Sequence, residues 1–260
     1  MEIRQTLKLA AGAAALFCLG AGVTAAALGT LPIGFARGAL SRVQVEQVVH
    51  DYLLAHPDVL VEMTNKLQAQ EAAATQKARS DALFAAGVDA LSDPKVAYVA
   101  GPKDAKVTVA EFFDYRCPHC KASLAAMQNL MANNKNVRVA FIERPILTPD
   151  SVVAAHAAVA SRRQGEKYIA FHNALMATQG ELPKERILDI AKGVGLDIAQ
   201  LERDMADPVV AESVNASNAL ANKLHFEGTP TFVVNGKIIV GELTAAELQN
   251  LAQQAAGGNG

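Results

Sequence analysis

Two cysteines, Cys117 and Cys120, stand where a strand-like sequence changes into a helix-like one. Residues 107–113 are rich in β-branched and aromatic side chains, which favours a buried strand. In residues 118–132 the apolar side chains recur at the spacing of one helix face, and residues 137–143 again favour a strand. This succession predicts a β-α-β unit that has the cysteine pair at the amino-terminal end of its helix.

At that place the first sulfur lies over the unpaired N–H groups and the positive dipole end of the helix. Both favour a thiolate at Cys117, which is a nucleophile and a good leaving group. Pro118 suits the first helical turn because it has no N–H to leave unpaired, and His119 can place a positive charge near the sulfur. We expect Cys120 to be the resolving thiol, and the redox-active disulfide Cys117–Cys120 needs no other cofactor.

The same side chains could instead bind a metal ion. Two thiolates and His119 would be three of the four ligands of a zinc site. They lie in one turn, however, with no second Cys-x-x-C and no histidine pair, so we predict no metal site. Cu(I) accepts two thiolates more easily, and a copper-binding or scaffold protein that uses the dithiol as a ligand remains an alternative.

Glu111 lies in the first predicted strand, six residues before Cys117. A carboxylate buried there would be suited to handling the proton of Cys120. Phe112 and Phe113 interrupt the alternation of the strand, so the pattern fits a surface-facing Glu111 equally well.

The remainder of the chain adds helices and a hairpin. Residues 150–224 are almost purely helical in pattern, with breaks at glycines and prolines, and are predicted to form an inserted helical domain. Two strand-like runs, 231–234 and 237–240, flank the Asn235-Gly236 pair, the strongest short-range signal of a β-hairpin. A closing helix over 244–254 and a disordered tail over 256–260 are expected.

Residues 41–92 are predicted to form helices that Pro57 interrupts. An apolar stripe continues along them to Leu67 and then thins out in an Ala/Gln/Glu/Lys stretch. Such a stripe either docks on the chain's own catalytic domain or pairs with copies of the chain. The second outcome, an oligomerisation segment, is favoured because the apolar positions do not persist.

The first 36 residues have the order of an export signal. Arg4 and Lys8 precede an apolar run over 9–28, and small residues follow. Residues 1–36 are therefore predicted to be a cleaved signal peptide or a retained membrane anchor, which places the rest of the chain in the periplasm. The net charge of −2, without a long basic run, argues against nucleic-acid binding.

The motifs resemble those of the DsbA-like thiol-disulfide oxidoreductases of the thioredoxin superfamily. The similarity lies in residues 111–121, Glu-Phe-Phe-Asp-Tyr-Arg-Cys-Pro-His-Cys-Lys, and in Gly-Thr-Pro at 228–230. It implies an α/β protein, a thioredoxin fold over residues 93–255 with the helical insertion at 150–224. It also implies that Pro230 is cis and faces the cysteines, and that Thr229 helps to bind the backbone of a substrate.

Residues 45–67 resemble the ScsC-type branch, in which the amino-terminal segment serves oligomerisation. Trimers of that branch act as disulfide isomerases or reductants in copper-stressed cells, whereas monomeric DsbA proteins act as oxidases. Thr229 before the proline favours the isomerase. The implied partners are client proteins with cysteines and a membrane thiol reductant, or a quinone-linked oxidant for an oxidase. The resemblance thus favours a homo-oligomeric periplasmic isomerase or reductase over a dithiol oxidase.

Overall fold

The computed structural model of the chain describes residues 40–257. The predicted signal or anchor at 1–36 lies outside the described residues. The chain divides between Val59 and Leu60 into two compact units. Within residues 40–257, no helix is both long enough and apolar enough to span a membrane.

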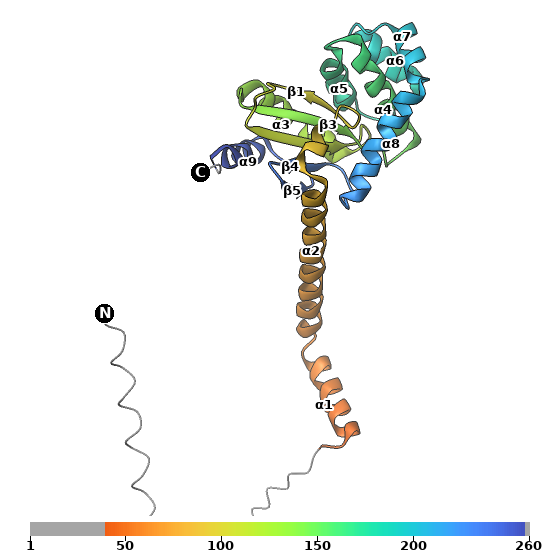
Figure 1. Cartoon of the computed structure of the whole chain (residues 1–260). Coiled ribbons are helices and arrows are strands. Elements are labelled where there is room, and N and C mark those ends of the chain that lie inside the picture. Colours follow the sequence, from red (N-terminus) through yellow and green to blue (C-terminus); the bar gives the residue numbers. More distant parts are fainter. Residues whose placement is uncertain (1–39, 258–260) are drawn as a thin grey trace, which may run out of the picture. The chain divides into compact units, whose positions relative to one another are not determined.

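The second unit is built on a five-stranded sheet in the order β1-β3-β2-β4-β5 (Figure 1). The strands are β1 (Ala97–Ala100), β2 (Val107–Phe113), β3 (Val137–Glu143), β4 (Thr231–Val234) and β5 (Lys237–Val240). β2 and β3 are parallel, and the other neighbours are antiparallel. Helix α3 (Pro118–Asn133) connects β2 to β3, which confirms the predicted β-α-β unit.

Both faces of the central strands are buried. Val109 and Phe113 belong to the apolar cluster of α3 and the closing helix α9 (Ala245–Gly257), whereas Phe112 belongs to a second cluster on the opposite face. Consecutive residues of a strand point to opposite faces, so Glu111 shares the face of Val109 and Phe113. This face is the one that α3 covers.

The segment between β3 and β4 is helical, as predicted. It contains α4 (Pro149–Ser161), the 3-10 turn η2 (Arg162–Gln164), α5 (Lys167–Ala177), α6 (Lys184–Gly193), α7 (Ile198–Met205) and α8 (Pro208–Lys223). Side chains of Thr148, Asp197 and Asp207 accept hydrogen bonds from the first turns of α4, α7 and α8. Such caps satisfy amides that have no partner within a helix.

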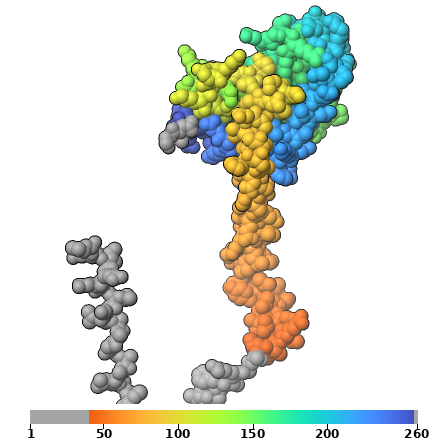
Figure 2. Space-filling model, viewed as in Figure 1, coloured from red at the N-terminus to blue at the C-terminus, as the bar shows by residue number. Residues whose placement is uncertain are grey.

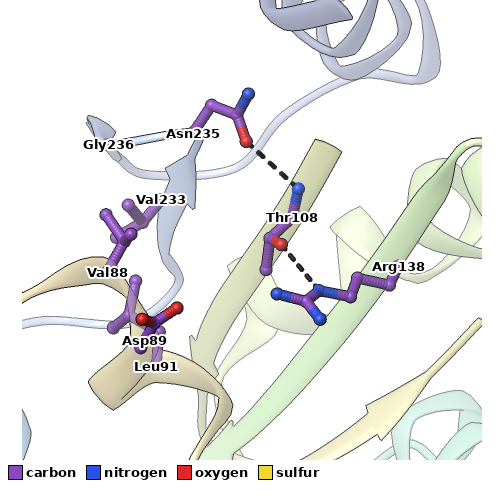
Figure 3. Close-up of a pocket in the computed structure, with 8 residues that line it drawn as sticks. All are labelled: Val88, Asp89, Leu91, Thr108, Arg138, Val233, Asn235 and Gly236. Carbon is purple, nitrogen blue, oxygen red and sulfur yellow. Dashed lines mark hydrogen bonds between the residues drawn. The ribbon is translucent and has the colours of Figure 1, made fainter. Parts of the chain in front are cut away.

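The turn of the β4–β5 hairpin is fixed to the start of β2 (Figure 3). Asn235 and Gly236 have φ values of 45° and 89°, as the predicted Asn-Gly turn requires. Oδ1 of Asn235 accepts a hydrogen bond from the backbone N of Thr108 at 3.2 Å, and Nε of Arg138 donates to Oγ1 of Thr108 at 2.8 Å. These side chains line a cavity of about 160 Å³ that neither cysteine reaches.

The amino-terminal segment forms two helices that are separated at Pro57, as the sequence predicts. α1 (Arg42–Ala55) starts at a capping box in which Ser41 and Gln44 bond reciprocally. It ends before Pro57, and α2 (Asp58–Ala86) follows, then the 3-10 turn η1 (Val88–Ser92). The apolar side chains of the stripe are exposed, among them Val45, Val48, Val49, Tyr52, Leu60, Met63 and Leu67.

Unlike the exposed first half of α2, the carboxyl-terminal end of this helix packs on the sheet domain (Figure 2). Leu83 is buried in the second apolar cluster, as is Leu91 of η1. Nε2 of Gln76 donates to the backbone O of Ile238 at 3.4 Å, and Nε of Arg79 donates to the backbone O of His225 at 3.0 Å. Residues that precede the expected domain start at 93 therefore contribute to its core.

The closing helix extends further than predicted. α9 runs to Gly257, so the disordered tail expected from residue 256 is wrong for residues 256 and 257. Ala255 still packs against the core, and alanine has the highest helix propensity, which together continue the helix beyond the predicted end. Residues 258–260 lie outside the described residues.

Two neighbouring residues of α2 test its docking. Leu83 is 3% exposed and Phe84 is 91% exposed. We expect Leu83→Ala to lower the free energy of unfolding by about 2–5 kcal/mol, because it leaves a cavity in the core. Phe84→Ala should change it by less than about 0.5 kcal/mol. Urea denaturation of both variants measures the difference, and equal effects would contradict the docking.

Candidate active site

Cys117 occupies the N-cap position of α3, and Pro118 begins the helix. Both cysteines are buried free thiols. Sγ of Cys117 donates a hydrogen bond to the backbone O of Thr229 at 3.2 Å. The structure thereby brings together the two motifs that are 112 residues apart in the sequence.

The loop before Cys117 is held by the buried carboxylate of Asp114. Oδ1 accepts hydrogen bonds from the backbone N of Arg116 at 2.7 Å and from Oγ of Ser151 at 2.7 Å. Oδ2 accepts from the backbone N of Ile146 at 2.9 Å and of Leu147 at 3.0 Å. One side chain therefore fixes the cysteine loop to the start of the helical insertion, a role that no pattern in the sequence indicated.

The bond between Thr229 and Pro230 is cis, which confirms the expectation from the resemblance. The backbone O of Pro230 accepts a hydrogen bond from the backbone N of Gly241 at 2.9 Å. Oγ1 of Thr229 is buried without a hydrogen-bond partner among the described residues. This hydroxyl is therefore available to the Cys117 sulfur once that sulfur is a thiolate.

The surroundings of Cys117 favour its charged form. A hydrogen bond from the Cys120 thiol has the largest effect, burial opposes it, and Thr229 and the backbone amides of Cys120 and His119 assist it. Together they lower the pKa of Cys117 to about 5. At neutral pH the sulfur is a thiolate, the nucleophilic form of a cysteine.

Cys120 has the opposite electrostatics, since burial, the hydrogen bond to Cys117 and the charge of Glu111 all raise its pKa. Glu111 is itself buried, so the surface-facing alternative is wrong. Burial, followed by the charge of Cys117, raises the pKa of Glu111 to about 8. A titratable carboxyl group thus lies within electrostatic reach of both sulfurs.

His119 is exposed at the first turn of α3, and its Nδ1 lies 2.9 Å from Oε2 of Glu242. The hydrogen bond and the charge of Glu242 raise the pKa of His119, and the charge of Cys117 adds to this. These contacts therefore favour the imidazolium form of His119, the cation expected beside the Cys117 thiolate. Glu242 follows β5 and had no sequence signal that linked it to the motif.

A buried polar cluster, which the sequence also did not indicate, supports the same loop. The hydroxyl of Tyr115 lies 3.1 Å from Nδ1 of His172 and donates to Oε1 of Glu143 at 3.4 Å. The hydroxyl of Tyr168 donates to the same oxygen at 3.1 Å. Burial lowers the pKa of His172 to about 3 and raises that of Glu143 to about 8. The only feature of the sequence that could have pointed to this cluster is Glu143, a carboxyl group at the end of the otherwise mostly apolar strand β3.

Within the described part of the chain, no three potential ligand side chains gather in a group that could hold a metal ion. The two thiols and His119 have the contacts described above instead.

Two family models match the chain. The model described as a DSBA-like thioredoxin domain matches residues 108–254, more than half of the chain. The model described as the N-terminal domain of the copper resistance protein ScsC matches residues 42–74. The second match covers α1 and the exposed first half of α2.

Two solved structures are similar to the chain in both sequence and fold. A thioredoxin-like oxidoreductase from Silicibacter pomeroyi is 44% identical, with a TM-score of 0.62, and the match covers 65% of this chain and 98% of that one. BcfH from Salmonella enterica Typhimurium is 30% identical with a TM-score of 0.69, over 83% of this chain and 96% of that one.

Curated relatives include much longer proteins. The Na⁺/H⁺ antiporter NhaA 1 of Salinispora arenicola is 35% identical over 147 residues, which are 56% of this chain and 22% of the antiporter. The chain spans less than a quarter of the length of the first antiporters that it matches.

The thiolate gives a pH prediction. Because the pKa of Cys117 is depressed, the charged sulfur stabilises the reduced fold above the ordinary pKa of a thiol. This stabilisation is lost as the pH falls through about 5. The ultraviolet absorbance of the thiolate should titrate with a midpoint near that value and shift upward in Cys120→Ala, which removes the main hydrogen bond. A midpoint near that of an ordinary cysteine would contradict the site.

Glu111 gives a kinetic prediction. Glu111→Gln keeps the shape of the side chain but cannot take a proton, so deprotonation of Cys120 should slow by on the order of 10²-fold. The mixed disulfide on Cys117 should then accumulate in acid-quenched time courses, whereas its formation keeps its rate. If Cys120 resolves the mixed disulfide at an unchanged rate in Glu111→Gln, Glu111 has no part in the mechanism.

Proposed function

The chain belongs to the family of DsbA-like thioredoxin domains, and on that premise we propose that it exchanges disulfides with client proteins through Cys117 and Cys120. The observation that carries the proposal is the Cys117 sulfur, whose pKa lies at about 5, in hydrogen-bond contact with Thr229 beside the cis proline Pro230. Low-pKa thiols of this kind are the attacking and leaving groups of disulfide exchange.

In the proposed reaction the Cys117 thiolate attacks one sulfur of a client disulfide, and the other client sulfur leaves as a thiolate. The product is a mixed disulfide between Cys117 and the client. Cys120 then gives its proton to Glu111 and attacks the Cys117 sulfur, which releases the second client thiolate. The client has gained two electrons, and Cys117 and Cys120 form a disulfide. The reverse sequence oxidises a client.

The electrostatics suit the order of these steps. The charge of Cys117 contributes to the raised pKa of Glu111. When Cys117 enters the mixed disulfide that charge disappears, so the carboxyl group ionises more readily. A larger fraction of Glu111 is then the carboxylate that can accept a proton, at the step in which Cys120 must lose its own.

The client chain is proposed to lie along Thr229 and Pro230, beside the attacking sulfur. Ile146 and Leu147 are half-exposed on the loop that Asp114 fixes to the cysteine loop. Apolar side chains at this place suit unfolded clients, which expose apolar segments of their own.

We further propose that the chain works in the periplasm without a cofactor other than its own disulfide. The export-type sequence at 1–36 supports this location. A membrane thiol reductant would keep the two cysteines reduced if the chain is an isomerase.

Two directions of exchange have support. The exposed stripe of α1 and α2, together with the match to the ScsC N-terminal model, favours a homo-oligomeric isomerase or reductase, with a trimer expected. The pKa of Cys117 at about 5 favours an oxidising couple and hence a dithiol oxidase as the second candidate. Isomerase is the primary proposal, because the stripe needs a partner to be buried.

The stripe variant Val49→Glu/Leu60→Glu separates the two candidates. Both residues are exposed, so the change leaves the fold intact but places charges where copies would meet. Light scattering should show an oligomer for the unaltered chain and a monomer for the variant. The monomeric variant should also reactivate scrambled ribonuclease more slowly than the unaltered chain. Asn65→Glu, on the other face of α2, is the matched control.

Thiol oxidation without reactivation, unaffected by the stripe variant, would establish the oxidase. Full insulin reduction by Cys117→Ser would refute both candidates.

A further inference from the structure

The segment that follows β5 forms hydrogen bonds with two parts of the active site, the cis-proline loop and helix α3. The backbone N of Gly241 donates to the backbone O of Pro230 at 2.9 Å. Two residues later, the backbone N of Leu243 donates to Oγ of Ser123, a buried residue of α3, at 3.2 Å. The segment therefore joins the cis-proline loop to α3, the helix that Cys117 caps.

Glu242 lies between these two anchors and reaches back to His119. Its Oε2 is 2.9 Å from Nδ1 of the imidazole. The backbone of His119 is held as well, because Oγ of Ser123 donates to its O at 3.2 Å. The amide of His119 in turn contributes a hydrogen bond to the Cys117 sulfur. A continuous set of contacts thus runs from Glu242 through His119 to Cys117.

We propose that Glu242 is a positioning residue that holds the His119 ring by Nδ1 and keeps it as an imidazolium beside the Cys117 thiolate. The inference rests on the proposed exchange activity and adds a residue that sets its equilibrium. With Nδ1 engaged, Nε2 is the ring nitrogen left for solvent or for a client sulfur. The cation stabilises the thiolate and so favours the dithiol over the disulfide.

The backbone hydrogen bonds around His119 and Glu242 position this ion pair, whose own Coulomb attraction is weak. The side chains of His119 and Glu242 are 67% and 55% exposed, so solvent and salt weaken their Coulomb interaction. The two anchors hold the backbone on either side of Glu242, which keeps its side chain within reach of the ring. The groups that act on the charge of the ring are Glu242 and Cys117, and both raise the pKa of His119.

Nuclear magnetic resonance titration of His119 in the full reduced chain is the first test. Glu242→Gln should lower the pKa of the ring, and Glu242→Asp should restore part of the loss. Glu227→Gln removes an exposed carboxylate near the cis-proline loop that has no contact with the ring, and should leave the titration unchanged. An unchanged titration in Glu242→Gln, or equal shifts in Glu227→Gln, would overturn the inference.

The exchange equilibrium with glutathione at neutral pH tests whether the effect reaches Cys117. Glu242→Gln should shift it toward the disulfide by roughly two- to fivefold, the range expected for an exposed ion pair. In a His119→Gln background the same change should have no effect. A shift toward the dithiol, or equal shifts in both backgrounds, would overturn the inference. Because the titration needs no activity, a chain that titrates as expected but exchanges no disulfide contradicts only the proposed function.

Discussion

The stabilisation of a negative sulfur at the first turn of α3 is the interaction on which the site depends. Cys117 is the N-cap residue, so its sulfur faces amides that the helix leaves unpaired. Amides alone do not fix the position of the loop. The side chain of Asp114 fixes that position: one of its hydrogen bonds lies within the loop, and the other three join the loop to the start of the helical insertion. The insertion thus helps to hold the nucleophile.

Two cysteines in one turn acquire different chemistry because their surroundings differ. Cys117 has donors from Cys120, Thr229 and the helix amides, and its pKa falls to about 5. Cys120 is enclosed beside Glu111, and its pKa rises. One sulfur is therefore charged and reactive, and the other keeps its proton until a mixed disulfide has formed. In the proposed exchange this difference sets the order of the steps, and Glu111 is the group proposed to take the proton of Cys120.

Local patterns in the sequence predicted the β-α-β unit, the Asn235-Gly236 hairpin and the helix starts, because each depends on neighbouring residues. The alternation failed for Glu111, because β2 is buried on both faces and apolar residues such as Phe112 and Phe113 occupy both. Glu242 and the docking of Leu83 could not be predicted, since they depend on contacts between distant segments. The cis proline followed from a family resemblance and not from the physics of the sequence.

The most direct test of the account is to trap its covalent intermediate. Cys120→Ser lacks the resolving thiol, so a client attacked by Cys117 should remain attached to it. The variant would be mixed with a disulfide-linked peptide at a pH above the Cys117 pKa, quenched with acid and mapped by mass spectrometry. The expected product is a stoichiometric mixed disulfide on Cys117 that a reductant reverses. No adduct on Cys117 in this variant would contradict the claim that its thiolate carries out the exchange.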